Sequence, residues 1–156
     1  MDFFVSEPVD LPPSAASGRF RRADLVFFGV ESRGESYIAR VFLDNPDTTV
    51  DTSPEREDGY AGRFVLFGHG GCVGERGHCD PSENRDPFDV GPPGGLTPQT
   101  KTVEITEALK TFVGGRVVVT IVPVRPSSDG VVRADNLAFS GLRLVAYELS
   151  ASQPAS

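Results

Sequence analysis

The sequence R-V-V-V-T-I-V-P-V, at residues 116–124, is the most strand-prone stretch of the chain. Valine, isoleucine and threonine are branched at Cβ, and they fit the pleated surface of a β-sheet better than the turns of a helix. The run therefore predicts a central strand. We expect its partner strand at residues 137–149, L-A-F-S-G-L-R-L-V-A-Y-E-L, after a polar connection at residues 125–136.

Four more stretches have the apolar and β-branched composition of strands, at residues 23–31, 36–44, 60–67 and 101–105. The connection S-R-G-E between the first two contains Gly34, and a glycine that adopts a positive φ is typical of hairpin turns. We therefore predict that these two strands pair with each other as a hairpin.

One short helix is expected at residues 107–112, with Thr106 as its N-cap and Gly114 and Gly115 closing it. Combined with the strands, it predicts an all-β fold. We expect an antiparallel β-sandwich of the jelly-roll or immunoglobulin-like kind, with six to seven strands and one short helix.

The composition of the 156 residues, with 38% hydrophobic and 24% charged side chains, is typical of one soluble globular domain. We predict an extended lead-in or linker at residues 1–21, the β-sandwich domain at 22–149 and a disordered tail at 150–156. The first residues, M-D-F-F-V-S-E-P, show no signal peptide, so the compartment is left open.

Charge and hydropathy exclude two kinds of partner. The net charge of −7 argues against nucleic acid, because phosphate binding requires clustered lysine and arginine. The apolar runs are too short to cross a bilayer, so no membrane partner is expected.

Both histidines and both cysteines of the chain lie within eleven consecutive residues, and they are His69, Cys72, His78 and Cys79. Five glycines at positions 68–77 would let this segment wrap around an ion. Imidazole and thiolate donors suit copper or zinc better than magnesium or calcium. The spacing H-x2-C-x5-H-C is therefore a candidate metal site, for Cu(I) or Zn(II).

The same two cysteines have other possible states. Cys72 and Cys79 are close enough in sequence to form a disulfide that closes a small loop, with both histidines as ordinary polar residues. They could also remain free thiols. The sequence leaves these three states open.

A polar loop at residues 45–59 carries five acidic residues. Their oxygen atoms suit calcium, but the D-x-D-x-D-G spacing of a calcium loop is absent. An ordinary solvated loop is therefore favoured over a calcium-dependent or small-ligand binding module, which we keep as an alternative function.

Catalysis by this chain is not expected. No G-x-S-x-G elbow is present, and a cysteine–histidine pair in a glycine-rich loop lacks the rigid framework that an activated nucleophile needs. The sequence therefore predicts a protein that is not an enzyme.

Three motifs resemble the C-terminal β-sandwich domain of type 3 copper proteins: Y-A-G-R-F at residues 60–64, K-T-V-E-I-T-E-A-L-K at 101–110 and R-V-V-V-T-I-V-P at 116–123. Plant polyphenol oxidases, bacterial tyrosinases and molluscan haemocyanins carry such a domain behind their dicopper domain. The resemblance covers about residues 22–148. It departs from the plant pattern at residues 38–43, where I-A-R-V-F-L replaces a lysine-phenylalanine-aspartate-valine signature.

The resemblance implies an accessory domain for a tyrosinase-like dicopper protein, which is the partner we suspect. In that family the sandwich covers the dicopper site, and some fungal relatives use a cysteine motif in it to help load copper. A coupled dicopper site needs six imidazoles, whereas this chain has two histidines. The implied role is therefore shielding or copper delivery, and the alternative is a structural or interaction domain with a Cys72–Cys79 disulfide.

Overall fold

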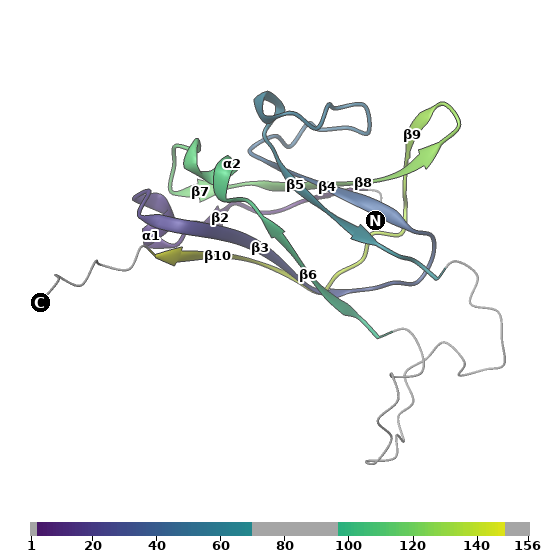
Figure 1. Cartoon of the computed structure of the whole chain (residues 1–156), viewed down its shortest axis with the longest axis horizontal. Coiled ribbons are helices and arrows are strands. Elements are labelled where there is room, and N and C mark those ends of the chain that lie inside the picture. The colour runs from purple at the N-terminus through teal and green to yellow at the C-terminus, as the bar shows by residue number, and fades with distance from the viewer. Residues whose placement is uncertain (1–2, 70–96, 149–156) are drawn as a thin grey trace, which may run out of the picture.

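The computed structural model describes residues 3–69 and 97–148 (Figure 1). These residues form, in chain order, β1 (Phe4–Val5), β2 (Val9–Asp10), α1 (Pro13–Ala16), β3 (Phe20–Val30), β4 (Tyr37–Leu43), the 3-10 turn η1 (Arg56–Asp58), β5 (Tyr60–Leu66), β6 (Gln99–Glu104), α2 (Thr106–Lys110), β7 (Arg116–Val117), β8 (Val119–Ser127), β9 (Gly130–Arg133) and β10 (Gly141–Glu148). Within the described ranges, no helix is long and apolar enough to span a membrane.

The strands form two main antiparallel sheets. One has the order β1-β8-β4-β5, with β9 also paired to β8, and the other has the order β10-β3-β6. A short pair, β2 with β7, lies beside them (Figure 1). Of the described strands, β3, β4, β5, β6, β8 and β10 have six or more residues. The predicted all-β antiparallel sandwich with a short helix is confirmed.

The central strand is β8, as predicted, because strands lie on both of its sides. Its first residues are buried on both faces. Val119 and Ile121 join the core between the sheets, while Val122 and Val124 form a second cluster with Phe42 on the outer face of the five-stranded sheet. Because both faces of β8 are buried, its side chains are apolar in a continuous run and do not alternate with polar ones.

The predicted hairpin between the first two long strands is wrong. β3 pairs with β10 and β6, whereas β4 pairs with β5 and β8. Gly34 does adopt a positive φ of 98°, but the turn carries the chain from one sheet to the other. Asn136 holds this crossover, because its side-chain amide donates to the carbonyl oxygens of Arg33 (3.4 Å) and Glu35 (2.8 Å).

The predicted pairing of the central strand with residues 137–149 is also wrong. β10 pairs with β3 along its whole length, in the opposite sheet. The polar connection contains β9, which turns back onto the end of β8, and the buried Leu137 then follows as the chain crosses between the sheets. Burial of Leu137 and Leu144 between the layers favours this crossover over a local hairpin.

Thr106 does not cap α2, which is a further correction. Ile105 is the N-cap residue, and Thr111 ends the helix in a right-handed conformation before the two glycines are reached. The Thr106 hydroxyl instead accepts a hydrogen bond from the Ala23 backbone N–H (3.1 Å) and donates to Glu104 (3.0 Å). The Thr106 hydroxyl therefore joins the start of the helix to β3, the strand that pairs with β6.

The N-terminal segment packs along both sheets. β1 pairs with β8 and β2 pairs with β7, while Pro13–Ala16 form the helix α1, so the segment predicted as an extended lead-in also contains a helical turn. The Phe4 ring lies 4.9 Å from that of Phe139 in an edge-on contact, which places it against the core. The tail predicted at residues 150–156 lies outside the described residues.

Candidate functional site

The start of the His/Cys segment is fixed at the end of β5. The Gly68 backbone N–H donates to the Ser36 hydroxyl (3.0 Å), and the His69 N–H donates to the Ser32 carbonyl (2.9 Å). His69 also forms a parallel bridge with Arg33. Two neighbouring backbone groups are thus hydrogen-bonded to the β3–β4 crossover, which gives His69 a defined position.

Gly68 is required here by close backbone contact. A Cβ atom at this position would lie 2.4 Å from the Gly34 carbonyl oxygen and 2.5 Å from that of Glu35. Any side chain would therefore push the end of β5 away from the crossover. The sequence showed only that a strand ends at this glycine, and its role in the contact depends on the tertiary fold.

Two further groups hold the crossover, and sequence reasoning had missed both. Asn136 donates to the two carbonyls described above, and Arg125 forms an ion pair with Glu35. Both come from the 125–136 connection, far away in sequence, so no local pattern identifies them.

Of the four predicted metal ligands, His69 is the one within the described residues, and its side chain is exposed. Cys72, His78 and Cys79 lie outside the described residues. Three predictions therefore stay open: that the four donors bind one ion, that Cys72 and Cys79 form a disulfide, or that both cysteines are free thiols. Within residues 3–69 and 97–148, no group of three or more His, Cys, Asp and Glu side chains could hold a metal ion.

The chemistry of the donor set fits Cu(I) or Zn(II), because it combines imidazole nitrogen with thiolate sulfur. His69 contributes an exposed imidazole, while its backbone N–H is already bonded to Ser32. The hydrogen bond of His69 to Ser32 thus uses its main chain and not its imidazole. His69 is therefore suited to be the fixed member of such a set.

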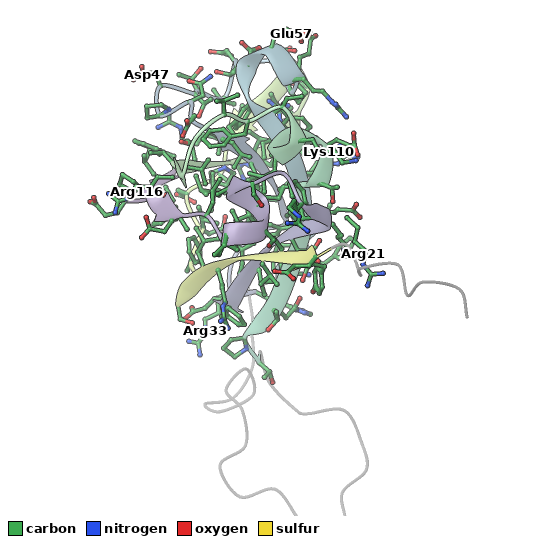
Figure 2. All side chains as sticks on the ribbon, turned by 90° about the vertical axis from the view of Figure 1, so that its left-hand side faces the viewer. Arg21, Arg33, Asp47, Glu57, Lys110 and Arg116 are labelled. Atoms are coloured by element: carbon green, nitrogen blue, oxygen red, sulfur yellow. The ribbon has the colours of Figure 1, made fainter. Side chains whose placement is uncertain are left out.

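The acidic 45–59 loop covers the outer face of the five-stranded sheet. Val50 packs on the cluster around Phe42, and the Arg40 side chain donates to the carbonyl oxygens of Val50 (3.2 Å) and Thr52 (3.4 Å). Figure 2 shows that Asp47 and Glu57 lie at the opposite end of the molecule from Arg33, which is bridged to His69. The acidic loop and the start of the His/Cys segment are thus separate regions.

An exposed apolar pair lies next to His69. Val65 is 41% exposed, and Phe67 is 76% exposed. On β5 the side chains of Phe64 and Leu66 face the core, so Val65 faces outward, and Phe67 continues this outward face beyond the strand end. Exposed aromatic rings at a defined position are typical of contact surfaces in proteins.

Tyr37 lies opposite Leu66 at this end of the sandwich and is almost fully buried. Its hydroxyl has no hydrogen-bond partner among the described residues. Burial raises the pKa of this hydroxyl to about 12, because the charged phenolate is poorly solvated there.

We expect the Tyr37→Phe variant to resist alkaline unfolding better than the wild type. Between pH 10 and 12 the unfolded tyrosine loses its proton while the folded one keeps it, so stability present below pH 10 is lost as the pH rises. The loss amounts to about 2–3 kcal/mol and is absent from the variant. At pH 7 the variant should be equally stable or about 1 kcal/mol more stable, because the unpaired hydroxyl is gone.

Urea unfolding at pH 7, 10 and 11.5 measures this difference. Tyr147→Phe is the matched control, since Tyr147 is 43% exposed and its replacement should leave the pH dependence unchanged. The same alkaline loss in Tyr37→Phe and in the wild type would contradict the assignment.

The fold has counterparts among solved structures. Latent aurone synthase, a polyphenol oxidase from natural source, matches with a TM-score of 0.50 and 14% sequence identity, over 96% of this chain and 25% of that chain. The recombinantly expressed latent aurone synthase matches with a TM-score of 0.47 and 14% identity, over 94% of this chain and 24% of that chain. No family model and no curated protein matches the chain.

This chain therefore spans about a quarter of the length of the polyphenol oxidase that it matches. At 14% identity the match shows a shared fold. It is consistent with the C-terminal domain of a tyrosinase-type protein, so the resemblance noted from the sequence is confirmed at the level of the fold.

Proposed function

We propose that this chain is an accessory β-sandwich of a tyrosinase-like dicopper protein, which it binds and shields. The supporting observation is that nearly the whole chain has the fold of one quarter of a polyphenol oxidase. The match covers 25% of that polyphenol oxidase, and these 156 residues contain two of the six imidazoles that a coupled dicopper site needs. The proposal therefore assigns catalysis to the partner.

The proposed contact surface is the end of β5, with Val65 and Phe67 exposed beside His69. The hydrogen bonds of Gly68 and His69 to the β3–β4 crossover fix the backbone at this point. An aromatic side chain has few rotatable bonds, so on a fixed backbone it loses little conformational freedom on binding, and aromatic residues often dominate protein interfaces. Phe67 is therefore the residue that we assign to the contact.

Copper delivery is a second candidate, favoured by the exposed imidazole of His69 at the start of the His/Cys segment. His69, Cys72, His78 and Cys79 would hold the ion, and a bound Cu(I) would supply the metal needed by the partner's dicopper site. This chain's residues would bind the ion and release it by ligand exchange with imidazoles of the partner. The copper remains Cu(I) throughout, so no oxidant or reductant takes part.

Binding of the purified chain to a tyrosinase-like dicopper protein tests the shielding role. We expect complex formation to lower the rate of diphenol oxidation by the partner. Phe67→Ala should weaken binding tenfold or more, since truncating a central aromatic residue of an interface costs about 2 kcal/mol or more. Calorimetry gives the affinity, and the oxidation rate gives the shielding.

Phe28→Ala is the matched control, because Phe28 is also exposed (41%) but lies on β3 in the other sheet. It should bind as the wild type does. Equal affinities for wild type and Phe67→Ala would contradict the assigned surface, and absence of any complex would contradict the shielding role itself.

A further inference from the structure

A groove of about 310 Å³ lies on the outer face of the five-stranded sheet. Its floor is formed by β4, β5 and β8, and residues of the 45–59 loop and of the β8–β9 hairpin border it (Figure 1). Both borders rise on the same side of the sheet. The groove continues the outer face of β5 that carries Val65, because Ile38, which lines the groove, is the cross-strand partner of Val65.

Two arginines line this groove directly opposite each other. Arg40 on β4 and Arg63 on β5 are partners in the antiparallel register, so their side chains project from the same face. Like charges at directly opposite positions of a strand pair are destabilising. An anion between the two guanidinium groups would remove this repulsion.

Among the described residues, no carboxylate offsets the repulsion between Arg40 and Arg63. The ion pairs within the described ranges involve neither Arg40 nor Arg63, and no acidic residue lines the groove. The Arg40 side chain is held in place by the carbonyls of Val50 and Thr52, and no side-chain hydrogen bond joins Arg63 to another described residue. Among the described residues, one guanidinium is thus positioned by hydrogen bonds and the other takes part in no ion pair.

The rest of the groove is largely apolar. Ile38 and Val124 are cross-strand partners on its floor, and Val131 lines it from β9. The Tyr60 ring also lines it and is held edge-on against Phe42, with ring centroids 5.6 Å apart. Binding sites for small molecules commonly combine such apolar walls with a few fixed polar groups.

We propose that this groove binds a small carboxylate with an apolar body, such as a monocyclic aromatic acid. The carboxylate would lie between Arg40 and Arg63, whose planar guanidinium groups can each donate two parallel hydrogen bonds. The apolar body would lie against Ile38, Val124 and Tyr60. The volume is near the lower limit of about 300 Å³ for ligand sites, which favours a single ring.

Titration of the full chain with benzoate tests this site, with backbone amide NMR signals as the readout. We expect saturable shifts of the amides of Ile38, Arg40, Arg63 and Val124. Benzyl alcohol has the ring without the charge, and inorganic phosphate has the charge without the ring. Both should bind at least tenfold more weakly than benzoate, and equal binding of either would overturn the proposal.

Two substitutions at Arg63 separate charge from geometry. Arg63→Gln should weaken benzoate binding at least tenfold, and Arg63→Lys should give an intermediate affinity, since it keeps the charge and loses the paired donors. Both changes are at an exposed side chain, so the remaining amide signals should be unchanged. Arg143→Gln on β10, in the other sheet, is the matched control and should bind benzoate normally. Unchanged affinity in Arg63→Gln, or equal losses in Arg63→Gln and Arg143→Gln, would overturn the assignment.

Discussion

Replacing Phe64 with alanine is expected to lower the free energy of unfolding by about 3–5 kcal/mol. The Phe64 side chain is 5% exposed, and its ring lies 5.0 Å from the ring of Phe27 on the opposite sheet and 6.4 Å from that of Tyr37. Alanine would leave a cavity between the two layers that these neighbours cannot fill. Since a domain of this kind is stable by about 5–15 kcal/mol in total, a large part of the stability would be lost.

Urea unfolding followed by far-ultraviolet circular dichroism measures this loss, and Phe67→Ala is the matched control. Phe67 is the same residue type a few positions further along the chain, but it is 76% exposed. Its truncation should change the free energy of unfolding by no more than about 0.5 kcal/mol. Similar effects of the two substitutions would show that the assignment of inner and outer faces to β5 is wrong.

The alternation of inward-facing and outward-facing side chains, which separates Phe64 from Phe67, can be recognised in the sequence. Most of the strands can be recognised in the same way. In Y-I-A-R-V-F-L, Tyr37, Ala39 and Val41 face the core between the sheets, while Arg40 faces outward. A period of two is the direct consequence of strand geometry, so one sequence suffices to find it. The positions of the long strands were predicted on this basis to within a few residues.

The pairing of those strands could not be predicted, because it depends on contacts between distant residues. The Asn136 amide reaches the Glu35 carbonyl, and the Ser140 hydroxyl donates to the Phe28 carbonyl (3.1 Å). Both contacts join segments more than 100 residues apart in sequence. Consecutive strands often pair as hairpins in β-proteins, and we expected the same here. In this fold, burial of apolar side chains between the two sheets favours pairing with distant strands instead.

One of the candidate sites could likewise be predicted from the sequence, and the other could not. His69 was identified from residue type alone, since imidazole and thiolate side chains are few in this chain. The Arg40–Arg63 pair was not identified, because each arginine by itself looks like a solvated residue on the outer face of a strand. Their significance follows from the β4–β5 register, which places them opposite each other.

The metal site predicted from residue type can be tested by replacing both cysteines. We expect the double variant Cys72→Ser, Cys79→Ser to bind Cu(I) far more weakly than the wild type. Thiolates are the soft donors that favour Cu(I), and serine hydroxyls do not replace them. The loss should exceed the roughly 10–100-fold effect of removing a residue that only supports a metal ligand, because here ligands themselves are removed.

Competition with a chromogenic Cu(I) chelator under reducing, anaerobic conditions measures the affinity. The matched control is the double variant Asp47→Asn, Asp51→Asn in the 45–59 loop, which removes two carboxylate charges in the other region and should leave Cu(I) affinity unchanged. His69→Ala should weaken binding as well, since it removes the one predicted ligand whose position the structure describes.

Unchanged Cu(I) affinity in the cysteine variant would rule out the His/Cys site and with it copper delivery. The intact mass of the native chain then separates the two remaining states, because a Cys72–Cys79 disulfide lowers it by the mass of two hydrogen atoms. The shielding role would survive this result, since it depends on Phe67 and the shared fold rather than on the cysteines.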